Sequence, residues 1–302
     1  MKNDIINQVI VLCLIMLVGL YGRKKEFIKE DTIKSLTDIL MNITLPCLIL
    51  SSFNMDFSKE LFYKVKLVII YSLLIHIVLA FLSKIFFIKF KGDKGIILRF
   101  VAIFSNFGFM GYPIVEGIYG KIGVFYAAIF GIPFNIILLT YGVIMFNKEE
   151  KNNLKIADIV MQPGILFVVI GLLIFMFNIK LPIYINNTLN IIGAMTTPLS
   201  MMIVGASFLG ASIYTIIKDI NLYYISIIRL MVIPFLIYFL LTAINADTYL
   251  LKLCVILEAM PAAAMTTVFA EKYNSDTIFS AKCIFVTTVL SIFTIPVVIT
   301  LL

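Results

Sequence analysis

The chain has 302 residues, of which 62% are hydrophobic and 14% are charged, and its mean hydropathy is +1.08. Soluble domains hold about 45–50% apolar and about 25% charged residues, so this composition excludes an ordinary water-soluble fold. The formal net charge is +7, but Lys and Arg form short clusters between apolar runs, such as Arg23-Lys24-Lys25. Because that pattern is typical of loops facing an anionic membrane surface, we do not expect nucleic-acid binding.

Ten apolar stretches are each long enough to cross a bilayer, which requires about 20 residues. They are predicted near residues 5–22, 33–54, 61–83, 96–118, 122–146, 156–178, 185–210, 222–244, 248–271 and 277–301. The sequence thus predicts an all-α integral membrane protein with ten transmembrane helices. Basic residues gather in the odd-numbered loops, so these loops are expected in the cytoplasm and both termini outside the cell.

The two halves of the chain resemble each other, which predicts an internal repeat. Residues 119–125 align with residues 273–279, and the charged stretch Asn147 to Lys155 joins the halves 1–150 and 151–302. Because each half holds five predicted spans, the second half must enter the membrane inverted. Inverted repeats are typical of secondary transporters, which bind substrate near the midplane where the repeats meet.

The fourth and ninth predicted spans contain residues that disfavour a continuous helix. They are Gly108, Gly111 and Pro113 in the fourth span, and Met260 and Pro261 in the ninth. Proline lacks a backbone N–H and glycine is a poor helix former, so both helices are expected to break, the fourth resuming around Tyr112 or Pro113. One such site would indicate a simple kink, but two at matching repeat positions favour a functional break.

Broken helices from inverted repeats are expected to cross near the centre of the membrane. Each half-helix N-terminus carries unpaired N–H groups and about half a positive charge. Two such ends facing one cavity would suit a carboxylate or another anion.

Several stretches resemble motifs of the auxin efflux carrier family, which includes plant carriers and bacterial permeases associated with malate and malonate. The stretches are Asn106–Pro113 with Tyr119–Gly120, Ala259–Pro261 with Val268–Asn274, Asn42–Ser51 and Thr197–Met201. The resemblance implies ten helices in an NhaA- and bile-acid-symporter-like fold, with helices four and nine crossing. It also implies a scaffold of helices 1, 2, 6 and 7, a mobile transport domain of helices 3–5 and 8–10, an elevator-like cycle and a homodimer.

Polar side chains in the apolar spans are the candidates for substrate binding. Asn106 leads them, because its amide both donates and accepts at the expected break; a local helix cap is the alternative. The other candidates are Gly108, Tyr112, Asn42, Asn135, Tyr141, Thr197 and Ser200, of which Thr and Ser commonly bond to their own helix instead. The residues expected to shape the backbone are Gly111, Pro113, Met260, Pro261, Pro46 and Pro198.

Glu258 is a carboxylate inside the ninth predicted span, where such groups are costly and usually mark a pathway, a proton relay or an ion partner. It is expected either to take up a proton during a transport cycle or to be a structural anion. In the second case its partner would be Lys252, Arg229 or Lys282. His76, in the third span, is expected to pack or to lie at the interface rather than to relay protons.

The sequence therefore predicts a secondary transporter of small organic carboxylate anions in the cell membrane. A channel or a transporter-derived sensor on the same fold is the alternative. No Ser-His-Asp set, His-Glu-x-x-His motif or nucleotide-binding loop is present, so neither an enzyme nor direct ATP drive is expected. No metal or cofactor site is expected either, because the chain has one histidine and no Cys-x-x-Cys pair.

Overall fold

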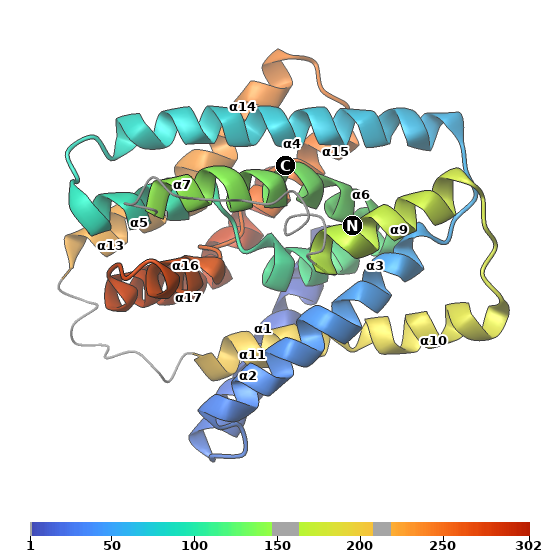
Figure 1. Cartoon of the computed structure of the whole chain (residues 1–302), viewed down its shortest axis with the longest axis horizontal. Helices are drawn as coiled ribbons and strands as arrows, with labels where there is room; N and C mark the ends of the chain where they lie inside the picture. The colour runs from blue at the N-terminus through green and yellow to red at the C-terminus, as the bar shows by residue number, and fades with distance from the viewer. Residues whose placement is uncertain (1, 147–162, 208–218) are drawn as a thin grey trace. The chain divides into compact units, whose positions relative to one another are not determined.

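The computed structural model of the chain describes residues 2–146, 163–207 and 219–302. Its secondary structure is helical, and no strand occurs within those ranges (Figure 1). The α-helices are α1 (Lys2–Lys24), α2 (Glu30–Ile39), α3 (Leu45–Phe53), α4 (Lys59–Phe86), α5 (Gly92–Ile103), α6 (Tyr112–Ile137), α7 (Val143–Phe146), α9 (Pro163–Met176), α10 (Ile183–Ala194), α11 (Thr196–Ala206), α13 (Ile220–Ile227), α14 (Ile233–Ala243), α15 (Thr248–Glu258), α16 (Met265–Lys272) and α17 (Thr277–Leu301). The π-helical turns are η1 (Leu40–Thr44), η2 (Phe107–Gly111), η3 (Leu138–Gly142) and η5 (Ile228–Val232).

Six helical segments of the described chain are long and apolar enough to cross a membrane. They are Glu30–Phe53, Lys59–Phe86, Phe107–Phe146, Ile183–Ala206, Ile220–Ala243 and Thr277–Leu301, and a shorter apolar helix covers Ile165–Met176. These helices support a multi-pass integral membrane protein, since helices satisfy their own backbone groups in lipid. The number of ten spans and the inverted repeat stay predictions.

The predicted fourth, fifth and ninth spans differ from single straight helices. The segment Phe107–Phe146 contains parts of two predicted spans, separated at Gly120, where φ is 62° and ψ is −153° inside α6. The ninth span consists of α15 with 11 residues and α16 with 8 residues, each too short to cross a bilayer alone. The predicted linker, Asn147 to Lys155, and the start of the sixth predicted span lie outside the described residues.

Three of the π-helical turns are each followed by a proline at the second position of the next α-helix. These prolines are Pro46 after η1, Pro113 after η2 and Pro234 after η5. Proline has no N–H, and its ring displaces the carbonyl four residues earlier, so the ordinary hydrogen-bond ladder cannot continue there. A single wider turn lets the helix go on, and such turns are frequent at functional sites. Pro198 instead lies in the first turn of α11, just after the chain turns at Met195.

The chain forms two compact units. Unit 1 comprises Met1–Ile69, Gly108–Ile132 and Ile156–Leu209, and unit 2 comprises Ile70–Phe107, Pro133–Lys155 and Gly210–Leu302. The long helices α4 and α6 each contribute residues to both units.

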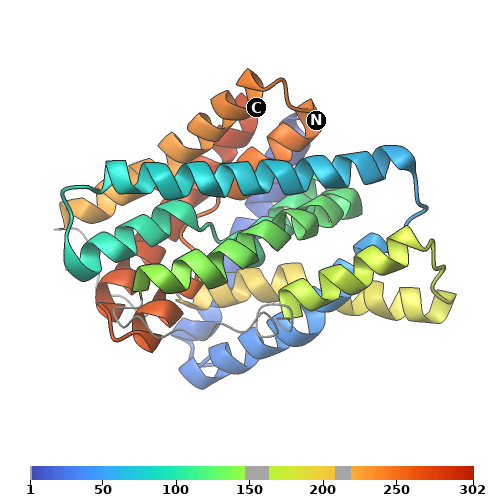
Figure 2. The ribbon, with the colours of Figure 1, turned by 45° about the horizontal axis from the view of Figure 1, so that its top comes forward.

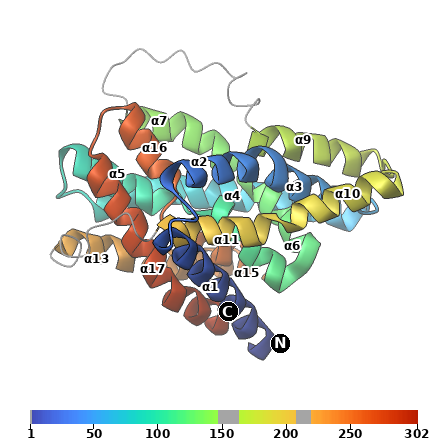
Figure 3. The ribbon, with the colours of Figure 1, turned by 90° about the horizontal axis from the view of Figure 1, so that it is seen from below.

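In unit 1, α1 packs closely across α11, and α3 packs against α9 and α10 (Figure 3). Glycines allow these contacts, because a Cβ on Gly19 or on Gly205 would overlap the backbone carbonyl of Met202 or of Met16 respectively. Gly171 of α9 likewise lies against the ring of Phe53.

In unit 2, α17 packs against α13, η5 and α16, while α14 and α15 pack together on either side of a short loop (Figure 2). Aromatic rings fill the space around the end of α5. Phe100 lies 4.6 Å from Phe104, 5.2 Å from Phe146 and 5.1 Å from Phe269, measured between ring centroids. This apolar packing surrounds the segment where the fourth predicted span is interrupted.

Replacing Gly205 with alanine is expected to lower the free energy of unfolding by about 1–3 kcal/mol, because the methyl group would force α1 and α11 apart. This cost exceeds the roughly 1 kcal/mol that alanine adds through its higher helix propensity. Thermal unfolding of the purified protein in detergent measures the change. The control is Gly108→Ala, whose added Cβ meets no described atom within 4 Å. Equal melting temperatures for the two variants would contradict the close packing of α1 on α11.

Candidate functional site

The helices of the fourth and ninth predicted spans are both interrupted, the ninth around Met260 and Pro261 and the fourth just before Gly108. Gly108 and Gly111 themselves lie in the π-helical turn η2, because a wider turn accommodates Pro113 without ending the helix. Helix α5 ends at Ile103, the chain runs without regular helix through Phe104–Asn106, and η2 begins at Phe107. Helix α15 ends at Glu258, and α16 begins only at Met265. The α-helix after the first interruption starts at Tyr112, as predicted, with the π-helical turn η2 in front of it. We call the two interruptions the breaks.

The two breaks are hydrogen-bonded to each other within unit 2. The bonds run from the Asn106 N–H to the Pro261 carbonyl (2.8 Å) and from the Ala263 N–H to the Phe104 carbonyl (3.1 Å). Between these bonds, Ser105 and Ala262 face each other as an isolated antiparallel bridge. The chain therefore replaces lost helix bonds with bonds between the breaks, as backbone groups inside a membrane require.

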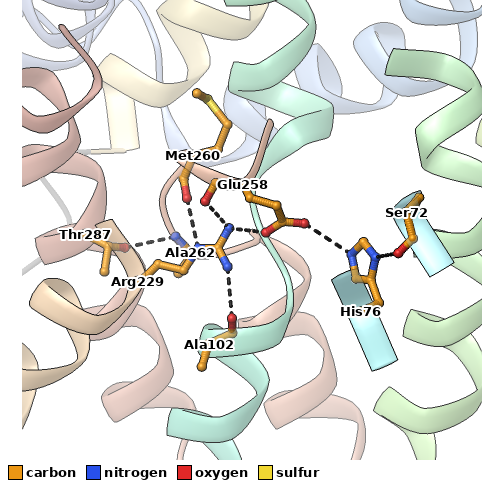
Figure 4. Close-up of polar contacts among 8 residues, drawn as sticks. All are labelled: Ser72, His76, Ala102, Arg229, Glu258, Met260, Ala262 and Thr287. Carbon is orange, nitrogen blue, oxygen red and sulfur yellow. Dashed lines mark hydrogen bonds and ion pairs between the residues drawn. The ribbon is translucent and has the colours of Figure 1, made fainter. Parts of the chain in front are cut away.

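Arg229, a residue of η5, binds carbonyl groups at both breaks (Figure 4). Its Nη1 donates to the carbonyl of Ala102 in α5 (2.9 Å), its Nη2 to that of Glu258 in α15 (2.7 Å), and its Nε to that of Met260 (3.0 Å). Carbonyls in the last turn of a helix lack intrahelical partners, and together they carry about half a negative charge. One guanidinium thus satisfies carbonyls and offsets negative charge at two C-terminal helix ends.

Glu258 forms an ion pair with this guanidinium and also contacts His76 of α4. Its Oε2 accepts a hydrogen bond from Nη2 of Arg229 (2.7 Å), and its Oε1 lies 3.3 Å from Nε2 of His76. The other ring nitrogen, Nδ1, lies 2.6 Å from the carbonyl oxygen of Ser72. All three ionisable side chains are 0% exposed. We call Arg229, Glu258 and His76 the charge network.

The structure shows which basic residue pairs with Glu258 and where His76 lies. Of the three basic residues considered as partners of Glu258, Arg229 forms the ion pair among the described residues. Of the two placements expected for His76, packing is the one that the structure shows, because its ring lies between those of Phe104 and Phe134, with centroids 6.4 Å and 5.1 Å away. The signal for Arg229 was present in the sequence, since an arginine inside an apolar span nearly always has a partner.

The breaks also carry or contact hydroxyl and amide groups. Asn106 is buried, with 6% of its surface exposed, and the Thr287 hydroxyl accepts a hydrogen bond from the Ala262 N–H (3.1 Å). The Ser105 hydroxyl is buried and has no hydrogen-bond partner among the described residues. The backbone N–H groups of Asn106, Ala262 and Ala263 already donate hydrogen bonds to other groups of the protein. They are therefore not the unpaired N–H groups that were expected to bind an anion.

The predicted site residues are divided between the two units. Unit 2 holds Asn106, Glu258, Met260 and Pro261 at the breaks. It also holds the half-buried Asn135 of α6 and Tyr141 of η3, with the Lys84 ammonium 6.0 Å from the centre of the tyrosine ring.

The remaining predicted site residues lie in unit 1, and they are Gly108, Gly111, Tyr112, Pro113, Asn42, Pro46, Thr197, Pro198 and Ser200. The Thr197 hydroxyl donates to the Glu116 carboxylate (2.8 Å), a pair that the sequence did not indicate. The Ser200 hydroxyl and the Asn42 amide instead bond back to carbonyls of their own helical segments, at 3.2 Å and 2.9 Å. For Ser200 this is the local bonding expected as the alternative to a ligand role, and Asn42 shows the same kind of bond, which was not expected for it.

A cavity of about 530 Å³ lies in unit 2 but involves none of the predicted site residues. Its walls come from the end of α4, the residues that follow it, and α13, including Lys89, Asn221 and Tyr224. These walls are mostly apolar, and they lack the converging polar groups that orient a bound ligand. The breaks therefore remain the candidate site.

Replacing Arg229 with methionine is expected to lower the free energy of unfolding by about 3–5 kcal/mol, because Glu258 would be left as an unpaired buried charge. Adding Glu258→Gln to that variant is expected to restore part of the loss. The measurement is thermal unfolding in detergent.

The matched control is Arg23→Met, which removes an arginine–glutamate pair at the surface, where Glu30 is 68% exposed. That change is expected to cost about 0–1 kcal/mol. Equal losses for the two methionine variants would show that the charge network is not what stabilises the breaks.

Comparisons with known proteins agree with a transporter. A family model described as a membrane transport protein matches residues 4–299. An uncharacterized transporter of Methanocaldococcus jannaschii is 29% identical over 302 residues, which cover 96% of each chain. The uncharacterized transporter YfdV of Escherichia coli is 21% identical over 288 residues, or 91% of this chain and 90% of the relative. The chain therefore belongs to the membrane transport protein family, which is the family of the auxin efflux carriers.

Proposed function

We propose that this protein is a secondary transporter of small organic carboxylate anions, and that the substrate carboxylate binds beside the breaks of unit 2. The observation that carries the proposal is the pair of helix interruptions at Phe104–Asn106 and Ala259–Ala264, which hydrogen-bond to each other. Irregular backbone is tolerated inside a membrane where protein buries it or where it lines a cavity. In secondary transporters, interrupted helices typically form the substrate site.

The charges at the breaks favour an anion. Arg229 offsets the negative C-terminal ends of α5 and α15, so these ends do not repel a bound anion. The N-terminal ends that follow the breaks, at η2 and α16, each contribute about half a positive charge. Together they match the single negative charge of a carboxylate.

The polar side chains at the breaks can supply specificity. Asn106 presents a buried amide that both donates and accepts hydrogen bonds. A buried hydroxyl without a partner costs about 1–3 kcal/mol, so the Ser105 hydroxyl would gain from a bound carboxylate or water. We therefore assign Asn106 as the main ligand residue and Ser105 as a second one.

An elevator-like alternating-access cycle fits the resemblance to auxin efflux carriers. Unit 1 contains most of predicted spans 1, 2, 6 and 7, and unit 2 contains most of spans 8, 9 and 10. These sets correspond to the proposed scaffold and to half of the proposed transport domain. This division supports the elevator-like cycle. The proposal also includes a cell-membrane location with both termini outside the cell, which rests on the distribution of basic residues in the loops.

Asn106→Ala is expected to reduce carboxylate uptake into liposomes at least tenfold, because a buried polar contact to a charged ligand contributes about 1.5–3 kcal/mol. Asn106→Asp is expected to be worse, since it places a negative charge beside the substrate. Radiolabelled malate, malonate and indole-3-acetate are suitable probes. The control is Asn187→Ala, at an exposed position of α10.

The same assay separates the alternatives. A carrier shows saturation and counterflow, a channel shows flux that does not saturate, and a sensor binds carboxylates without moving them. Wild-type transport by both Asn106 variants would contradict the proposed site.

A further inference from the structure

The two ring nitrogens of His76 both face oxygen atoms. Nδ1 lies 2.6 Å from the Ser72 carbonyl oxygen, and Nε2 lies 3.3 Å from Oε1 of Glu258 (Figure 4). A neutral imidazole carries one N–H, which leaves a lone pair on the other nitrogen. The carbonyl oxygen of Ser72 can only accept, so the proton of a neutral ring belongs on Nδ1. The lone pair of Nε2 would then face an oxygen of a carboxylate, which is repulsive unless one more proton lies between them.

The charges around this contact also call for one additional proton. The C-terminal ends of α5 and α15 together contribute about one negative charge, which Arg229 offsets with its positive charge. Glu258 then adds a second negative charge, and a proton on His76 cancels it. The group is electrically neutral only with that proton bound, and neutrality is strongly favoured where water is excluded.

No other described charged group provides this compensation. The ionisable groups that face Glu258 are Arg229 from η5, His76 from α4 and the Cys254 thiol one turn earlier on α15. The guanidinium is already bonded to Oε2, and the thiol is neutral when protonated.

We infer that His76 and Glu258, held in place by Arg229, form a buried proton-binding site. The bound proton lies between Nε2 of His76 and Oε1 of Glu258, with Nδ1–H donating to Ser72. When the proton leaves to solvent, the imidazole becomes neutral with its remaining hydrogen on Nδ1, and Glu258 stays ionised against Arg229. The attraction between α4 and the end of α15 then becomes a repulsion.

Binding at this site would make the proton the coupling ion of the proposed transporter. This coupling role, unlike the proton site itself, rests on the proposed function. Proton binding changes a contact between α4 and one of the two breaks, so it can favour one state of the breaks over another. A ligand shifts such an equilibrium only through its different affinity for the two states. Reversal of the His76–Glu258 contact provides that difference for a proton.

The chain contains a single histidine, which makes the site directly observable. The full-length protein, labelled with ¹⁵N-histidine and purified without a histidine tag, is reconstituted in lipid bilayers for solid-state NMR. Spectra are recorded from about pH 5 to about pH 9, a range that brackets ordinary histidine titration. We expect both ring nitrogens to be protonated at the acidic end, and Nε2 alone to lose its proton as the pH rises.

Two variants sharpen the measurement. Glu258→Gln removes the carboxylate and is expected to leave a neutral ring with a proton on Nδ1 alone across the whole range. The control is Glu271→Gln, the same change at an exposed position of α16, which is expected to titrate like the wild type. A wild-type ring that stays neutral throughout, or a Glu258→Gln ring that titrates like the wild type, overturns the proton site. If Glu258→Gln does not fold, the wild-type titration decides alone.

The coupling is tested separately by flux. A pH gradient across liposomes is expected to drive carboxylate accumulation by the wild type, and His76→Gln is expected to abolish this accumulation while downhill flux continues. Protonation of His76 without any carboxylate flux would leave the proton site in place and reject the proposed transport function. Equal gradient-driven accumulation by both proteins would reject the coupling.

Discussion

A backbone that breaks inside a membrane still has to satisfy its carbonyl groups, and Arg229 does so for two breaks at once. Its guanidinium bonds to the carbonyls of Ala102, Glu258 and Met260, which belong to segments more than a hundred residues apart. Lysine could not replace it, because a single ammonium does not offer donors in a planar fork. The remaining features of the candidate site depend on this arrangement, since these bonds join the two breaks in addition to the backbone bonds between them.

The surroundings strengthen the interaction. Rings of Phe104 and Phe134 enclose His76, and further aromatic packing covers the end of α5. Excluding water makes each charge contact in the network stronger and each unpaired charge more costly. The network therefore stabilises the C-terminal ends of α5 and α15 at the breaks, while Asn106 and Ser105 of the first break are the side chains proposed to bind a ligand. Structural stability and the proposed substrate binding thus involve different residues of the same region.

Much of this arrangement could be predicted from the sequence, and the reasons for the failures are physical. Composition predicts a helical membrane protein, and the local chemistry of Gly108, Pro113 and Pro261 predicts the breaks, because backbone geometry depends on near neighbours. The choice of Arg229 as the partner of Glu258, and the burial of His76 beside it, required tertiary contacts between distant segments. The same holds for the pair of Thr197 and Glu116. Prolines at matching repeat positions also differ in local backbone structure. Pro46 follows a π-helical turn and Pro198 does not, so the presence of proline alone did not predict the helix geometry.

Disulfide formation between Ser105→Cys and Ala262→Cys tests the pairing of the breaks most directly. Residues opposite each other between two such hydrogen bonds have Cα atoms about 4.5 Å apart, within the roughly 4.4–6.8 Å that a disulfide requires. The four native cysteines are first replaced, and a protease site is inserted into the predicted linker, Asn147 to Lys155. After mild oxidation in membranes and cleavage, the account predicts that the two fragments stay joined until a reductant is added. Fragments that separate without reductant, as in a control pairing Ser105→Cys with Glu271→Cys, would contradict it.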